Sequence, residues 1–261
     1  AAPGSSGGPV FNKTGEVIGL IMGVLEEQNW ATIVIPVNNA FSMLERHGVY
    51  KTTLPDDAAE QVLTPVAGIS EKELRALESY NKGTQTLDMA EKKDYYGRAV
   101  ELLPDFYEAW FNLAVAYGRN NDWKNACNTY LKAIALRPDS VEARRNLGRA
   151  YLELKEYDKA VQVFREVVQL LPNNPQSYND LGEAYRNAGH YESAVEAFNR
   201  ALALDRQYAN ALYNLAMTQV QQENWAPAYS AFEQYLAAAP VAEDRERVES
   251  WMHKIKEQMK P

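Results

Sequence analysis

Apolar residues recur along residues 107–240 with a helical spacing that repeats every 34 positions. Each copy carries two stripes of apolar residues three and four positions apart, which predicts two amphipathic helices joined by a polar turn. Small residues at the eighth and twentieth positions of a copy allow the two helix backbones to approach closely. The matching positions in successive copies are Trp110, Leu113, Ala114, Tyr117, Ala126, Tyr130, Ala133 and Pro138; Arg144, Leu147, Gly148, Tyr151, Ala160, Phe164, Val167 and Pro172; Tyr178, Leu181, Gly182, Tyr185, Ala194, Phe198 and Ala201; and Leu212, Leu215, Ala216, Ala228, Phe232 and Pro240. We therefore expect four helical hairpins, over residues 107–140, 141–174, 175–208 and 209–242.

One such hairpin cannot bury its own apolar face, so successive copies must stack on one another. Over residues 107 to 240 the pattern resembles the tetratricopeptide repeat (TPR) family. This resemblance implies a mainly α fold, a right-handed superhelix (solenoid) of stacked hairpins that binds a protein or peptide. Upstream, residues 71–106 follow the pattern less closely and predict a divergent first hairpin. Downstream, residues 241–261 predict one amphipathic helix that caps the last hairpin.

The first part of the chain follows a different pattern, in which short apolar runs alternate with polar or glycine-rich turns. Strands are predicted over residues 9–11, 16–22 and 31–37. The fold class expected for the whole chain is thus mainly α, preceded by a small β-rich segment. We place that segment at residues 1–47 and a linker at residues 48–70.

The sequence Gly-Ser-Ser-Gly-Gly-Pro at residues 4–9 resembles the nucleophile loop of trypsin-like serine proteases, with Ser6 in the reactive position. Residues 15–19 and 35–38 resemble two later strands of the bacterial HtrA-type members of that family. The second of these resemblances implies that a C-terminal helix follows, at about residues 39–46. The resemblance implies that the β-rich segment is the C-terminal fragment of such a β-barrel. It also implies that the backbone N–H groups of Ser6 and Gly4 form the oxyanion hole. The alternative interpretation of the loop is a flexible glycine-serine linker.

In that family the general-base histidine and its orienting aspartate precede the serine, whereas five residues precede Ser6 here. A serine without a base is a weak nucleophile near neutral pH. His47, His190 and His253 follow Ser6, and we expect them to be solvated or packing residues. The resemblance therefore implies a serine endopeptidase as the parent protein and no peptidase activity for this chain alone.

Two alternatives to that expectation stay open. The chain is one half of a nicked but assembled endopeptidase, in which Ser6 is still the nucleophile and the missing N-terminal part of the protease domain is a partner. Otherwise it is a purely structural solenoid that carries an inactive vestige, which predicts no reaction at Ser6 even in the uncut parent.

The TPR resemblance implies a concave groove lined by the first helix of each hairpin. The peptide-binding side chains that we predict for this groove are Phe111, Arg145, Arg149, Asn179, Arg186, Tyr213 and Met217. Arg145 and Arg149 lie one helical turn apart and could together hold a ligand carboxylate. Pairing with Glu142, Glu183 or solvent is the alternative for these two arginines. The lysine and asparagine set of the carboxylate clamp that binds chaperone tails is not matched, so we do not predict that ligand.

The net charge and the cysteine content exclude some classes of partner and site. The formal net charge of −8 argues against a phosphate-binding surface, so nucleic acid is not an expected partner. The single cysteine, Cys127, excludes an intramolecular disulfide and is expected to be a small buried residue. We expect no cofactor, no metal site and no membrane span. No signal peptide is visible, and the HtrA-type resemblance alone implies a periplasmic or secreted location.

Overall fold

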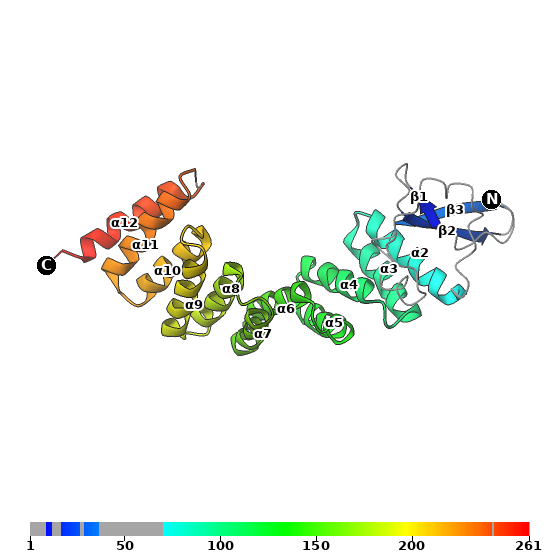
Figure 1. Ribbon diagram of the computed structural model, residues 1–261, viewed down its shortest axis with the longest axis horizontal. Helices are drawn as coiled ribbons and strands as arrows, with labels where there is room; N and C mark the ends of the chain where they lie inside the picture. The colour runs from blue at the N-terminus through cyan, green and yellow to red at the C-terminus, as the bar shows by residue number, and fades with distance from the viewer. Residues whose placement is uncertain (1–8, 12–16, 27–28, 37–69, 242, 261) are drawn as a thin grey trace. The chain divides into compact units, whose positions relative to one another are not determined.

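The computed structural model describes residues 9–11, 17–26, 29–36, 70–241 and 243–260. Within these residues the chain forms three strands and eleven helices (Figure 1). The chain consists of two compact units, and the boundary between them lies between Pro138 and Asp139. This boundary is in the turn after helix α5 (Trp123–Leu136; Figure 1). The sequence pattern contains no sign of this boundary, because the repeat continues through it without a change of spacing.

The strands form an antiparallel sheet in the order β1 (Pro9–Phe11), β2 (Val17–Glu26) and β3 (Asn29–Pro36). In the β2–β3 pair, Gly19 lies opposite Pro36 and Glu26 lies opposite Asn29. These strands overlap the three segments predicted from the sequence, although β2 continues further than predicted. Gly4, Ser6, the expected helix near residues 39–46 and most of the expected linker lie outside the described residues. The protease resemblance therefore stays a prediction.

The helices of the first unit are α2 (Glu71–Gln85), α3 (Met89–Leu102), α4 (Tyr107–Arg119) and α5 (Trp123–Leu136). Helix α2 starts at a capping box, in which Glu73 donates its backbone N–H to Ser70 Oγ and its carboxylate accepts the Ser70 N–H. Leu77, Tyr80 and Phe106 are buried in the core between α2, α3 and α4. The pair α2 and α3 occupies the region where the sequence predicts a divergent first hairpin.

The second unit continues with α6 (Val141–Glu153), α7 (Tyr157–Leu170), α8 (Pro175–Asn187), α9 (Tyr191–Leu204), α10 (Ala209–Gln221), α11 (Trp225–Ala238) and α12 (Arg245–Gln258). Helices α6 and α7, α8 and α9, and α10 and α11 pack as hairpins, and α12 packs on α11 (Figure 1). Each hairpin lies within one predicted repeat. Helix α12 buries Val248, Met252 and Ile255 against the last hairpin, as expected for a cap.

Packing of an aromatic ring explains the glycine at the eighth position of two repeats. A Cβ atom on Gly148 would lie 2.6 Å from the ring of Phe164, and one on Gly182 would lie 2.5 Å from the ring of Phe198. Both phenylalanines are almost fully buried. The aromatic ring of the second helix thus fills the space that a side chain on the first helix would need.

The turns inside the hairpins share one backbone conformation. Asn121, Lys155, Gly189 and Glu223 occupy the same position in successive repeats and have φ values of 57°, 59°, 80° and 58°. This left-handed conformation ends the first helix and lets the next residue donate its backbone N–H to a carbonyl of the last turn, as Glu156 does to Tyr151 at 2.9 Å. Only one repeat has glycine, the residue that adopts this conformation without strain.

Candidate functional site

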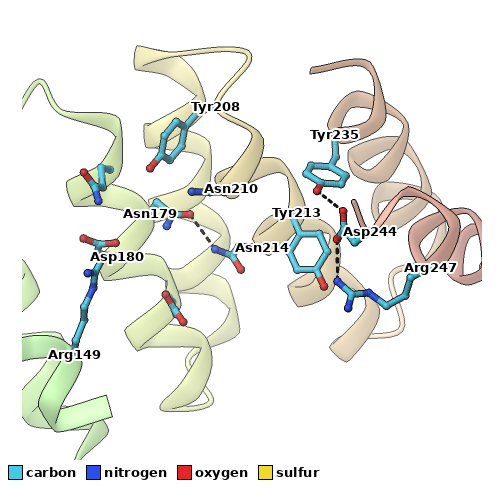
Figure 2. A pocket seen from close by; sticks show the side chains of 12 residues that line it. Arg149, Asn179, Asp180, Tyr208, Asn210, Tyr213, Asn214, Tyr235, Asp244 and Arg247 are labelled. Carbon is cyan, nitrogen blue, oxygen red and sulfur yellow. Dashed lines mark hydrogen bonds and ion pairs between the residues drawn. The ribbon is translucent and has the colours of Figure 1, made fainter. Parts of the chain in front are cut away.

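Polar side chains from the first helix of each hairpin in the second unit line a cavity of about 400 Å³ (Figure 2). We call it the polar pocket. Its lining residues are Arg149, Gln176, Asn179, Asp180, Glu183, Tyr208, Asn210, Tyr213, Asn214, Tyr235, Asp244 and Arg247. Most belong to α6, α8 and α10, and α11 and α12 complete one end.

Helical spacing brings these side chains together. On α8, residues 176, 179, 180 and 183 are separated by three or four positions or are adjacent, which places them on one helix face. Residues 210, 213 and 214 form the matching face of α10. Because α8 and α10 contact each other, the two polar faces border the same cavity.

Two asparagines join α8 and α10 through their side chains. Asn214 donates from Nδ2 to Oδ1 of Asn179 at 3.0 Å, and Arg186 donates from Nη1 to Oδ1 of Asn214 at 3.2 Å. Asn179 is only 5% exposed. A side-chain amide can donate and accept at the same time, so Arg186, Asn214 and Asn179 form one chain of hydrogen bonds that fixes the orientation of both amides.

A buried carboxylate lies beside these amides. Asp180 is 6% exposed, and its Oδ2 lies 3.1 Å from Nε of Arg145 on α6. The two atoms form an ion pair without hydrogen-bond geometry, and neither has a hydrogen-bond partner among the described residues. Burial raises the pKa of Asp180, while the positive charges of Arg149 and Arg145 lower it. Figure 2 shows Arg149 reaching from α6 toward this carboxylate.

A second charged group closes the pocket at the C-terminal end. Tyr235 of α11 donates its hydroxyl to Oδ1 of Asp244 at 2.7 Å, and Nη2 of Arg247 lies 2.9 Å from Oδ2 of the same carboxylate (Figure 2). Burial and the hydrogen bond to Asp244 raise the pKa of Tyr235 to about 12. The hydrogen bond from Tyr235 lowers the pKa of Asp244. These contacts hold the start of α12 against α11.

The structure brings part of the predicted groove together. Arg149, Asn179 and Tyr213 line the polar pocket. Arg186 adjoins it through its hydrogen bond to Asn214, and Arg145 through its ion pair with Asp180. The binding role of these residues stays a prediction.

The remaining two predicted residues lie elsewhere. Met217 lines a different, apolar cavity. Phe111 belongs to the first unit, where its ring centroid lies 6.0 Å from that of Tyr107 and 5.9 Å from that of Tyr130. A binding role for either residue also stays a prediction.

Sequence reasoning missed Asp180, the partner of Arg145. The alternative partners expected for Arg145 are Glu142, Glu183 or solvent, whereas the structure pairs it with Asp180. One signal was present, because the sixth position of successive repeats is polar throughout, with Asn112, Asn146, Asp180 and Asn214. In two other repeats this residue also contacts the first helix of the preceding hairpin, since Asn112 bonds Tyr80 Oη and Asn214 bonds Asn179.

The apolar cavity has a volume of about 410 Å³ and lies between α10, α11 and α12. Its lining residues are Met217, Val220, Trp225, Phe232, Trp251, Lys254, Ile255 and Gln258. Tyr213 connects the two cavities, because it lines the polar pocket and its ring centroid lies 6.2 Å from that of Trp251.

Other expectations can be compared with the described residues. Cys127 is buried, as predicted. Among the helices of the described part, none combines the length and apolar character needed to cross a membrane. The same part contains no group of three or more histidine, cysteine, aspartate or glutamate side chains placed to hold a metal ion.

Four tetratricopeptide-repeat family models match the helical region, over residues 95–128, 115–175, 155–202 and 181–253. The helical part of the chain is an array of tetratricopeptide repeats. The TPR array therefore provides a protein-interaction scaffold. A comparison with curated protein sequences gave no significant match.

Solved TPR structures have the same fold. MamA (residues 41 to the end) from Desulfovibrio magneticus RS-1 superimposes with a TM-score of 0.57 and 21% identity, covering 69% of this chain and 98% of that one. YrrB, described as a TPR protein with an unusual peptide-binding site, gives 0.55 and 20%, covering 69% and 90%. PilF from Pseudomonas aeruginosa gives 0.53 and 22%, covering 73% and 94%. At these identities the likeness shows the fold.

Proposed function

We propose that the polar pocket binds an extended peptide segment of a partner protein. The observation that carries this proposal is the pair of oriented amides, Asn179 and Asn214, in the same cavity as the exposed residue Arg149. Amides bind a peptide main chain regardless of its sequence, and a guanidinium adds a charge-assisted bond to a carboxylate. The volume of about 400 Å³ lies within the usual range for ligand sites.

Substitution of Arg149 gives the most direct test of this function. Arg149 lines the polar pocket, is exposed and forms no ion pair with another described residue. Peptides of about 12 residues, which span roughly 40 Å when extended, would be selected from a random library on the purified chain. We expect Arg149→Gln to weaken the selected acidic peptides by about tenfold, the effect of losing one charge-assisted hydrogen bond.

Arg200→Gln is the matched control, since Arg200 is an exposed arginine on α9 and does not line the polar pocket. It should leave the dissociation constant unchanged. Equal affinity of the wild type and the Arg149→Gln protein, measured by fluorescence polarisation, would show that the peptides bind elsewhere.

For the N-terminal region we propose descent from a trypsin-like serine protease of the HtrA type. The proposal is supported by the glycine-rich sequence around Ser6 and by the apolar runs that follow it. In a parent endopeptidase, the TPR array would recruit a substrate, a regulator or a second copy of the enzyme. The proposed location is then the periplasm or the extracellular space.

A fluorophosphonate probe tests the state of Ser6. This chain alone should gain no probe mass, because its sequence places no histidine before Ser6 to act as the base. An adduct on Ser6 that disappears in Ser6→Ala would instead support the alternative of a nicked, assembled protease.

A further inference from the structure

The apolar cavity has the lining expected of a binding site for an apolar group. Phe232 and Ile255 form buried walls, and Met217, Val220, Trp225 and Trp251 are partly exposed around it. The lining contains two indole rings and no acidic residue. Protein interiors are otherwise close-packed, so an open apolar volume of about 410 Å³ favours entry of an apolar side chain that displaces water.

The rim of the apolar cavity carries a single charge. Lys254 of α12 is exposed and forms no ion pair with any other described residue. The nearby Glu257 lies instead within 3.8 Å of His253 and 4.0 Å of Lys260. An apolar group that also carries a carboxylate therefore matches both the walls and the rim.

The geometry of an extended peptide restricts where that carboxylate can be. Successive side chains of an extended chain point to opposite faces, so an acidic residue next to the apolar one points away from the cavity. The C-terminal carboxylate differs, because it is attached to the Cα atom that bears the terminal side chain. The apolar cavity also lies at the last hairpin of the array, adjoining the polar pocket through Tyr213 and Trp251.

We propose that the apolar cavity binds the C-terminal residue of a peptide, with a phenylalanine or leucine side chain inside it and the terminal carboxylate paired with Lys254. This proposal rests on the peptide-binding function proposed above. The preceding residues of the same peptide extend into the polar pocket, past Tyr213. The ligand class is therefore a protein with an exposed apolar C-terminus.

The direct test uses N-acetyl-L-phenylalanine and its amide as probes, titrated into the full chain and followed by NMR. The expected shifts are at the indole N–H of Trp251 and the methyl group of Met217, with a dissociation constant on the order of 1 mM for so small a ligand. The free acid should bind about threefold to fivefold more tightly than the amide, the size expected for an exposed ion pair. N-acetylglycine, which lacks the apolar group, should produce no shift.

Two variants separate the parts of the site. Lys254→Gln should remove the difference between acid and amide, while Lys256→Gln, an exposed lysine that does not line the cavity, should preserve it. Val220→Trp should fill the cavity and abolish the shifts of both probes. Equal binding of acid and amide by the wild type, absence of shifts at Trp251 and Met217, or full binding by a folded Val220→Trp protein would each overturn the proposal.

The same variants distinguish this proposal from the peptide-binding function. Library peptides that lose affinity with Arg149→Gln and keep it with Val220→Trp would support the polar pocket and overturn the C-terminal site. Cavity shifts with N-acetyl-L-phenylalanine, in the absence of any selected peptide, would support the terminal-residue site and contradict the wider function.

Discussion

Nε of Arg145 lies 3.1 Å from Oδ2 of Asp180, so that a charge on one hairpin is balanced by a charge on the next. Both side chains are largely buried, with exposed fractions of 19% and 7%. Removing one partner of such a pair leaves an uncompensated charge, which is more costly than the pair itself is stabilising. The contact therefore fixes how α6 and α8 can pack.

The free energy of unfolding should depend on pH because Asp180 is buried. Burial raises the pKa of Asp180 above its ordinary value of 3.8, so the folded state binds more protons than the unfolded state between pH 3.8 and the raised pKa. The contribution of Asp180 to the free energy of unfolding thus falls as pH rises through this window. Asp180→Asn should lose this slope, so that its stability relative to wild type improves from pH 3.8 upward and then becomes constant.

Urea denaturation at a series of pH values between 3.8 and neutrality measures this difference. Asp158→Asn, an exposed aspartate on α7, serves as the control and should parallel the wild type. A relative stability of Asp180→Asn that worsens with rising pH would mean that the arginines, rather than burial, dominate the site.

Gly182→Ala should destabilise the chain by about 1–3 kcal/mol, because the new Cβ atom would overlap the buried ring of Phe198. Gly97→Ala is the opposite case, since a Cβ atom there meets nothing within 4 Å and α3 continues through it. Alanine should stabilise that site by up to about 1 kcal/mol. Chemical denaturation of both proteins decides the matter, and a loss of the same size at the two sites would rule out the steric explanation.

Glu223→Gly should increase the free energy of unfolding by about 1 kcal/mol, because glycine relieves the left-handed backbone at φ 58°. Glu223→Ala is the control that removes the side chain and keeps the strain, and it should produce no such gain. Gly189→Ala, at the equivalent turn with φ 80°, should have the opposite effect of similar size. Thermal melts of the three proteins provide the comparison.

Tyr235→Phe should destabilise the docking of α12 by about 1 kcal/mol, since it removes the hydroxyl that donates to Asp244 at 2.7 Å. Hydrogen exchange in α12 should accelerate more than exchange in α8. Tyr229→Phe, on the same helix and without a hydrogen bond to another described residue, is the matched control. Unchanged exchange of α12 in Tyr235→Phe would show that its apolar contacts alone hold the cap.

Much of the helical fold could be predicted because its information is local and repeated. The 34-residue period places each pair of helices, for example α8 and α9, within one predicted repeat. Helical spacing likewise predicts that Asn179 shares one face with its neighbours on α8. The small residue at the eighth position is visible in the sequence, whereas only the structure shows that the neighbour of Gly148 or Gly182 is a phenylalanine ring of the second helix.

The site was only partly predictable because it depends on contacts between hairpins. Arg149, Asn179 and Tyr213 could be selected by their repeat position, whereas the pairing of Arg145 with Asp180 and the apolar cavity beside Trp251 could not. A period identifies which face of a helix a residue occupies, and it says nothing about the side chain that the next hairpin brings to that face. Sequence alone therefore defines the repeats and their polar face, while tertiary packing decides which charges are paired and where an open apolar volume remains.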